Sequence, residues 1–248
     1  MRDSIKTIAR KYKMLVTFYR IINNSFSVMN RKFMYPLFNQ HRLKQKLKGI
    51  DKLNLGCGLD LLRGWLNIGL FPDLEIPYGT VKMKKGALLL NFDLTQELSI
   101  QEKSIKYIYA SHFVEHISFK DVKKILEWSY KVMEDGGVIR LTFPDLGLWI
   151  NNYAENNTVF FQKYYQLTKD NNELPDLKTK GEIFMSQVNN WGHKWGYDFE
   201  SMKRILEEAG FTDVKMKKPY ESIIPNIKTI EPGSEGRLLE TAYVEAKK

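Results

Sequence analysis

Four side chains in this 248-residue chain can take up a proton at a reacting centre: His112, His116, His193 and Asp145. An imidazole whose pKa lies near its ordinary value of about 6.5 removes a proton efficiently at neutral pH. We therefore predict His193, Asp145 and His116 as candidate catalytic residues. Each has a structural alternative: His193 bridging loop backbone, His116 fixing a turn, and Asp145 capping the helix that follows.

The spacing of two of these histidines also raises the question of a metal site. His112 and His116 are four residues apart, with Glu115 between them, so one helix face would hold both imidazoles. Two histidines at that spacing can bind zinc. The segment does not read H-E-x-x-H, however, and no clear third ligand is near in sequence, so we predict no metal site.

Residues 53–58 read L-N-L-G-C-G, a short apolar run that leads into a glycine-rich turn. Because glycine has no Cβ, a ligand can approach the backbone closely at such a turn. The third glycine of a dinucleotide-binding fingerprint is absent, since Leu61 takes its place, and no G-x-x-x-x-G-K-[ST] run occurs. The turn therefore indicates either a ligand-binding loop or a tight strand-to-helix connection.

The elements that must position these residues alternate between short apolar runs and amphipathic stretches, which predicts an α/β fold. One helix is expected over residues 120–134, ending at Gly136-Gly137, and another over residues 199–209, between the N-cap Asp198 and Gly210. We predict a doubly wound, seven-stranded, mostly parallel sheet with strands at residues 52–55, 66–70, 87–92, 105–110, 138–143, 213–218 and 241–247.

Residues 146–195 break this alternation and are rich in aromatic side chains, among them Trp149, Trp191 and Trp195. An insertion after the fifth strand of an open sheet lies above the carboxyl ends of the strands, where ligands bind in such folds. The aromatic rings suit either the apolar face of a sugar or ordinary packing.

Residues 1–50 hold twelve Lys or Arg and one acidic residue, Asp3, whereas the remainder of the chain holds 26 basic and 28 acidic side chains. Apolar residues recur at helical spacing within residues 1–48, and Pro36 is expected to end or bend a second helix. This basic amphipathic extension fits an anionic membrane surface, a nucleic acid, or packing against its own domain with its charges solvated. The oligomeric state stays open.

The cysteine content and the hydropathy of the chain indicate the cellular compartment in which the protein works. Cys57 is the one cysteine, so no intrachain disulfide forms, and a reducing compartment is the default. No stretch reaches the roughly 18 apolar residues of a membrane-spanning helix, and we find no export signal. We expect a cytoplasmic protein, peripheral at the inner face of the membrane where the extension binds lipid.

Several motifs follow one another in a specific order: L-N-L-G-C-G, G-W-L-N-I, N-F-D-L-T, I-K-Y-I-Y-A-S-H-F-V-E-H-I, G-G-V-I-R-L-T-F-P-D-L, H-K-W-G-Y-D-F-E-S-M-K-R-I-L-E-E-A-G-F and Y-V-E-A-K. In this order the chain resembles class I S-adenosylmethionine-dependent methyltransferases. It is most similar to the small-molecule methyltransferase-domain group associated with bacterial polysaccharide biosynthesis. The resemblance runs from about residue 53 to the C-terminus, roughly four-fifths of the chain.

The resemblance implies a set of residues that hold S-adenosyl-L-methionine. It puts the glycine turn against the cofactor, with Asn54 where many relatives have an acidic residue. It puts Asp93 beside the adenine amino group, and Ser111 and His112 beside the cofactor and the acceptor. Asp93 has a structural alternative as a turn residue that bonds its own backbone. The implied cofactor-binding residues are Asn54, Gly56, Cys57, Gly58, Asp93, Leu94, Ser111 and His112.

One position departs from the pattern of this group. The second strand usually ends in an aspartate that holds the ribose hydroxyls, and here the corresponding residue is Gly69. Losing a charge-assisted hydrogen bond weakens binding by roughly 1.5–3 kcal/mol. Asp60, Asn67 and Asp73 are the residues near enough in sequence to compensate.

The resemblance implies an O-methyltransferase that acts on a sugar hydroxyl of a surface polysaccharide or its precursor. Residues 51–248 would form the catalytic domain, with residues 146–195 as an acceptor-binding insertion. Two alternatives stay open. One is a methyltransferase acting on RNA or another nucleic acid, against which stands the position of the basic residues outside the catalytic body. The other is a non-catalytic binding module with Gly69 as its mark.

Overall fold

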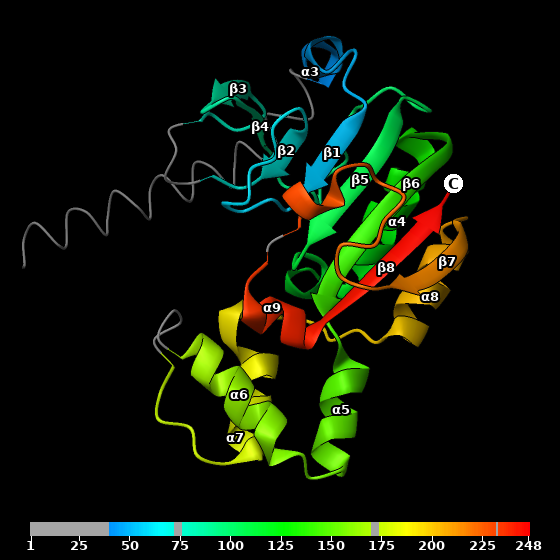
Figure 1. Ribbon diagram of the computed structural model, residues 1–248. Helices are drawn as coiled ribbons and strands as arrows, with labels where there is room; N and C mark the ends of the chain where they lie inside the picture. Colours follow the sequence, from blue (N-terminus) through cyan, green and yellow to red (C-terminus); the bar gives the residue numbers. More distant parts are fainter. Residues whose placement is uncertain (1–39, 72–75, 170–173, 232) are drawn as a thin grey trace, which may run out of the picture.

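A computed structural model describes residues 40–71, 76–169, 174–231 and 233–248 (Figure 1). The predictions for residues 1–39, including the bend at Pro36, lie outside the described residues. Within the described residues, a mixed eight-stranded sheet forms the body, with the order β3-β4-β2-β1-β5-β6-β8-β7. Its strands are β1 Lys52–Leu55, β2 Leu66–Gly69, β3 Val81–Lys84, β4 Ala87–Asn91, β5 Ile105–Ser111, β6 Met133–Pro144, β7 Thr212–Lys217 and β8 Thr241–Lys247.

Six of these eight strands point the same way, and β3 and β8 run against them. The chain moves outward from β1 through β2 to β4, then returns to place β5 on the other side of β1. The sheet therefore reverses its winding between β1 and β5. This order, with β8 lying antiparallel between β6 and β7, is the Rossmann-like methyltransferase fold.

Side chains of the central strands alternate between two buried faces, as expected where a parallel sheet is covered on both sides. Leu53, Leu66 and Ile108 pack on one face with apolar residues of α3 (Gln40–Lys46), α4 (Phe119–Val132) and α8 (Phe199–Glu208). In that cluster Leu43 and Leu47 come from the end of the predicted basic extension. This part of the extension thus packs against the sheet body.

The opposite face of the sheet is covered mainly by irregular chain. Tyr109 and Val138 pack there against Leu62, Trp65 and Ile224. Ile224 belongs to the long connection between β7 and β8, which also contains η4 (Ile227–Thr229) and α9 (Glu235–Glu240). Figure 1 shows this connection crossing in front of β5 and β6.

A helical lobe follows β6, as predicted for residues 146–195. It contains α5 (Leu146–Ala154), α6 (Thr158–Thr168), α7 (Lys180–Asn189) and the short η3 (Asn190–Gly192). A separate aromatic cluster centred on Trp149 holds these helices together. Figure 1 shows the lobe at the end of the sheet where β6 finishes and β8 begins.

Two sequence-based predictions need correction. The sheet has eight strands in the described residues rather than seven, because β3 forms a hairpin with β4 through Lys85 and Gly86, whose φ angles are 50° and 79°. The second correction concerns α4, which ends at Val132 rather than at Gly136-Gly137. The carbonyls of its last residues, Lys131 and Val132, accept hydrogen bonds from the Lys103 and Ser104 amides. The helix therefore ends there, and β6 begins at the next residue, Met133. The predicted boundaries of α8, including the Asp198 cap, are confirmed.

Candidate functional site

The glycine turn leaves β1 at the point where the sheet reverses its winding, which is where open α/β sheets bind ligands. Gly56 and Gly58 have φ angles of 61° and 50°, a region that side chains rarely adopt. Among the described residues, no atom lies within 4 Å of the place where a Cβ on Gly58 would be, so they leave the turn open there. Gly56 is covered, because Phe113 occupies the space above it.

Two residues predicted to touch the cofactor, Asn54 and Cys57, have buried side chains. Asn54 is buried, and its amide donates to the Asp60 carbonyl and to Oδ1 of Asn67, both at 2.9 Å. Cys57 is also buried, and desolvation raises the pKa of its thiol to about 12, so the thiol is neutral at physiological pH. Both side chains therefore pack beneath the backbone of the glycine turn, on its buried side.

Compensation for the missing acid at Gly69 does not come from Asn67. The Asn67 side chain is fully buried and bonds Leu62 at both its amide and carbonyl, as well as the Leu88 carbonyl. Asp60 lies at the surface and forms an ion pair with Arg237 at 3.1 Å. Asp73 is outside the described residues.

Asp93 occupies the turn after β4, where its Oδ1 accepts from the amide and the hydroxyl of Thr95 at 3.0 and 2.7 Å. This is the turn geometry that its sequence context allows. Leu94 is buried in the main core and lines a cavity of about 330 Å³ beside α4. The turn therefore engages the Asp93 carboxylate and packs Leu94 inward.

Ser111 ends β5 and His112 follows it, at the same edge of the sheet as the glycine turn after β1. The Ser111 hydroxyl lies 3.1 Å from the Thr142 hydroxyl and 3.5 Å from a guanidinium nitrogen of Arg237. His112 has a φ of 46°, and its Nε2 lies 2.8 Å from the Thr241 hydroxyl. Arg237, which sequence reasoning missed, thus spans from the β1 turn to the end of β5.

The prediction that one helix face holds His112 and His116 is wrong. His112 lies before η2 (Val114–His116), and its positive φ turns the chain away from helical geometry. The structure instead brings His193 next to His116, with ring centroids 4.9 Å apart. Glu115 joins them, and one donor atom from each of the three side chains lies within 4.8 Å of the others.

His193 is positioned by the segment that leaves the helical lobe. Its Nδ1 lies 2.7 Å from the Gln187 carbonyl, and the amides of Lys194 and Trp195 donate to the Glu115 carbonyl. Burial lowers the pKa of the His193 imidazole, the largest of several opposing effects. Neutral His193 therefore carries its proton on Nδ1 and keeps an unprotonated Nε2.

Asp145 caps α5, as the structural alternative proposed. Its Oδ1 accepts from the Gly147 and Leu148 amides at 3.0 and 3.3 Å. Burial raises the pKa of this carboxyl despite those bonds. Asp145 does not line either of the cavities that contain His193.

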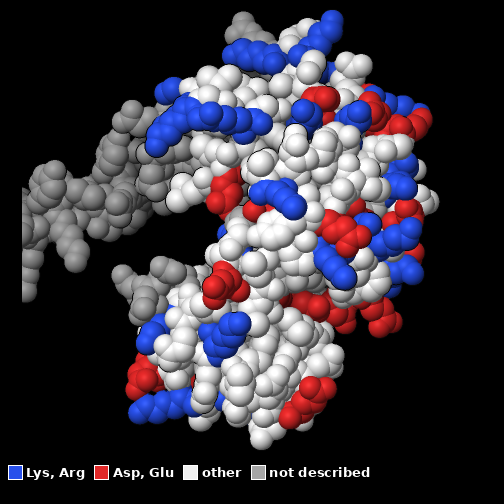
Figure 2. Space-filling view, viewed as in Figure 1, with Lys and Arg blue, Asp and Glu red and all other residues white. Residues whose placement is uncertain are grey.

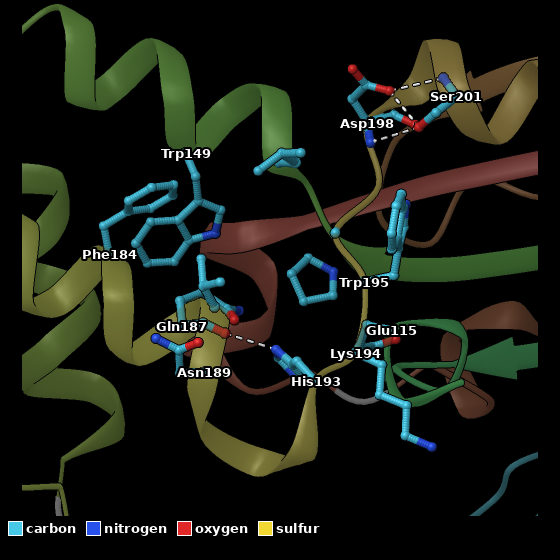
Figure 3. Close-up of a pocket in the computed structure, with 14 residues that line it drawn as sticks. Glu115, Trp149, Phe184, Gln187, Asn189, His193, Lys194, Trp195, Asp198 and Ser201 are labelled. Atoms are coloured by element: carbon cyan, nitrogen blue, oxygen red, sulfur yellow. Dashed lines mark hydrogen bonds between the residues drawn. The ribbon is translucent and has the colours of Figure 1, made fainter. Parts of the chain in front are cut away.

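Two cavities meet at Glu115 and His193. The first, of about 620 Å³, has Trp149 and Phe184 on one side and Trp195 on the other, with Asp198 and Ser201 at one end (Figure 3). The second, of about 630 Å³, is lined by polar side chains that include His112, His116, Arg237 and Glu240. Figure 2 shows that this side of the molecule is hollowed between the sheet body and the helical lobe.

Glu240, in the wall of the second cavity, was not among the predicted site residues. It is almost completely buried and accepts a hydrogen bond from the Gln187 amide nitrogen. Desolvation raises the pKa of its carboxyl to about 7, against smaller lowering effects of His112 and Gln187. No sequence motif marks this residue, since its burial depends on the packing of α9 against the helical lobe.

No protein-family model matches the chain, and no curated protein matches it. Solved structures with a similar fold include an S-adenosylmethionine-dependent methyltransferase from Archaeoglobus fulgidus, with 19% identity over 90% of this chain and 99% of that one and a TM-score of 0.46. A possible histamine N-methyltransferase from Thermotoga maritima shares 16% identity over 93% and 97% of the two chains, with a TM-score of 0.44.

Haemonchus contortus phosphoethanolamine N-methyltransferase 2, solved with S-adenosylhomocysteine, shares 13% identity with a TM-score of 0.45. That match covers 86% of this chain and 53% of the nematode protein, so this chain spans about half of its length. At these levels of identity the likeness concerns the fold and assigns neither substrate nor activity.

Proposed function

We propose that this protein is an S-adenosylmethionine-dependent methyltransferase that acts on a hydroxyl group of a small molecule. One observation carries the proposal. The glycine turn after β1 and the residues from Ser111 to His116 after β5 face each other at the switch point of the sheet. Ligands of open α/β sheets bind at this place, and the motif resemblance names the ligand.

Three features of the edge fit the cofactor. Gly58 leaves open space above the backbone, as the approach of an adenosyl or methionine group requires. Arg237, held by Asp60 beside Ser111, offers a guanidinium to the cofactor's carboxylate. Exposed Leu59 and Leu70 add apolar surface next to the glycine turn and at the end of β2. When bound, S-adenosylmethionine supplies a methyl group already activated by its sulfonium.

The two cavities beside His193 supply room for the acceptor. Trp149, Phe184 and Trp195 present aromatic surface, while Gln187 and Asp198 present hydrogen-bonding groups. Flat aromatic faces combined with a few polar groups suit a sugar ring. We propose a carbohydrate acceptor, such as a surface polysaccharide or its lipid-linked precursor, and the motif resemblance supports this choice.

Transfer to a hydroxyl requires that its proton be removed. Glu115 and His193 line both cavities, His116 lines the second, and the Nε2 of neutral His193 is unprotonated. We assign activation of the acceptor hydroxyl to this cluster. Asp145 is a weaker candidate because α5 already uses its carboxylate as a cap.

The basic extension would keep such an enzyme near its acceptor at the inner face of a membrane. Its charge supports this part of the proposal, with anionic lipid as the partner and a nucleic acid as the alternative. Within the described residues, no helix is long and apolar enough to cross a bilayer. Retention on anionic vesicles, compared with retention on RNA at matched salt concentration, separates the two partners.

Gly69 and Phe113 favour a second candidate, a binding module that has kept the fold without the chemistry. Gly69 lacks the acid, and Phe113 covers part of the glycine turn. A methyl-transfer assay with radiolabelled S-adenosylmethionine and a panel of nucleotide sugars and glycans distinguishes the two candidates. The enzyme produces labelled glycan, and Trp195→Ala reduces the yield. Cofactor binding without any labelled product across the panel would favour the module.

A further inference from the structure

Glu115 is a buried carboxyl group whose hydrogen-bonding capacity is unused within the described residues. The side chain is 2% exposed, and neither carboxylate oxygen has a hydrogen-bond partner among the described residues. The Nδ1 of His112 comes within 3.2 Å of Oε1, but not in hydrogen-bonding geometry. Burying a carboxyl group that accepts no hydrogen bond is costly, so a cation between Glu115 and its neighbours would stabilise this arrangement.

His193 has the orientation of a metal ligand. Its Nδ1 donates to the Gln187 carbonyl at 2.7 Å, which fixes the ring and leaves the Nε2 lone pair free (Figure 3). Metal-binding histidines usually donate their second ring nitrogen to a carbonyl or carboxylate in this way. The ring of His116 lies next to that of His193, with centroids 4.9 Å apart.

Backbone contacts hold the three groups together although they lie far apart in sequence. Glu115 and His116 belong to η2, and His193 follows η3 at the end of the helical lobe. The amides of Lys194 and Trp195 donate to the Glu115 carbonyl at 2.7 and 3.2 Å, so the segment carrying His193 is tied to η2. One donor atom from each side chain lies within 4.8 Å of the other two.

We propose that Glu115, His116 and His193 bind a divalent first-row transition-metal ion, with Zn²⁺ the best match to two imidazoles and one carboxylate. Three protein ligands leave at least one coordination position open. Both cavities reach the cluster, so a water or an acceptor oxygen has access to that position. A bound metal lowers the pKa of an oxygen ligand, which is the activation that a hydroxyl acceptor needs.

The metal site does not depend on the proposed methyltransferase activity, and its test needs no cofactor. The full chain, stripped with EDTA and dialysed, is titrated with ZnCl2 by calorimetry. Co²⁺ is added in parallel, because its visible absorption reports coordination by nitrogen and oxygen ligands. We expect one equivalent of Zn²⁺ with micromolar or tighter affinity and a Co²⁺ spectrum typical of four or five ligands.

Three variants separate the cluster from adventitious binding. Glu115→Gln keeps the side-chain volume and removes the charge, and His193→Ala removes the oriented imidazole. We expect each to weaken Zn²⁺ binding at least tenfold and to abolish the Co²⁺ spectrum, with folding checked by circular dichroism. His41→Ala, which changes a histidine of α3, serves as the matched control and should bind as the wild type does.

The proposal is overturned by a folded wild-type protein that binds no Zn²⁺. It is equally overturned if Glu115→Gln and His193→Ala, both folded, bind as tightly as His41→Ala. Titration of the same samples with S-adenosylhomocysteine in EDTA tests the cofactor site separately. A failed metal site therefore cannot be mistaken for a failed methyltransferase.

Discussion

The ring of Phe113 lies where a side chain on Gly56 would have to be: a Cβ there would come within 2.0 Å of Cδ2 of Phe113. Gly56 also has a φ of 61°. The turn after β1 and the residues after β5 are thus fitted to each other. This contact explains the need for glycine at position 56 without any ligand, whereas the open space above Gly58 is available to one.

Gly56→Ala is expected to lower the free energy of unfolding by roughly 2–5 kcal/mol, the sum of left-handed strain and overpacking. Removing the ring with Phe113→Ala relieves the overpacking. The double variant should therefore be more stable than the sum of the two single losses predicts, by about 1–3 kcal/mol in urea denaturation. Strictly additive losses would show that the two residues do not compete for this space.

Gly69→Asp restores the acid that the related group uses to hold the ribose. A Cβ at this position would be 3.5 Å from Cys57 Sγ and from Phe71, which are ordinary contact distances, so a Cβ can be accommodated. We expect S-adenosylhomocysteine to bind more tightly by roughly 1.5–3 kcal/mol, about 10- to 100-fold, in calorimetric titration. Gly69→Ala is the control and should leave affinity unchanged. An equal effect of Ala and Asp would rule out a charge-assisted bond.

The strands β1, β2, β4 and β5 were predictable from sequence because they are short, apolar-rich runs, of which residues 87–90 are apolar on both faces of the sheet. β3 was not, because Val81–Lys84 is short and half charged, and its partner is defined by a hairpin turn. The end of α4 was also misplaced, since amides from another loop complete its last turn.

Sequence reasoning identified the parts of the candidate site whose residues are neighbours in the chain. It missed the parts that form only when distant segments meet in the fold. The glycine turn can be read from residues 53–58 alone. The pairing of His116 with His193 depends on where η3 returns to η2, and no local pattern records that distance. The same holds for Arg237, which reaches the β1 turn from the far end of the chain.

Arg140 is completely buried between Glu231 and Glu245, at 2.6 and 3.1 Å. Arg140→Leu would leave two buried carboxylates without their cation, and we expect a loss of about 3–5 kcal/mol in the free energy of unfolding. Lys123→Ala removes an exposed pair with Glu208 and should change stability by less than about 1 kcal/mol. Urea denaturation of both variants measures the difference. If the Arg140 and Lys123 variants lost similarly small amounts of unfolding free energy, the buried ion-pair network would not be stabilising.

Glu240 should make stability depend on pH in a defined direction. Burial raises the pKa of its carboxyl from 4.5 to about 7, so the folded state binds a proton more tightly than the unfolded state does. Stability relative to Glu240→Gln is therefore greatest at low pH. It falls as the pH rises from about 4.5 to 7, by up to about 3 kcal/mol, and is then constant.

Thermal and urea unfolding at a series of pH values, in EDTA, check this expectation. The side-chain amide that Glu240→Gln introduces can still accept, through its oxygen, the bond that Gln187 now donates, so the fold should be kept. A stability difference between the two proteins that does not change from pH 4.5 to 8 would contradict the account.

We expect the edge between β1 and β5 to bind the cofactor, with Arg237 holding its carboxylate. Arg237→Met removes that cation without changing the glycine turn, and Arg204→Met removes an exposed arginine of α8 that pairs with Glu208. We expect the Arg237 variant to bind S-adenosylhomocysteine about 10- to 100-fold more weakly than the wild type. The Arg204 variant should bind normally.

The most direct measurement is calorimetric titration of the folded full chain with S-adenosylhomocysteine. We expect one site per chain with micromolar affinity, weakened by Arg237→Met and unaffected by Arg204→Met. A folded wild-type protein that shows no binding would mean that this edge of the sheet is not a cofactor site.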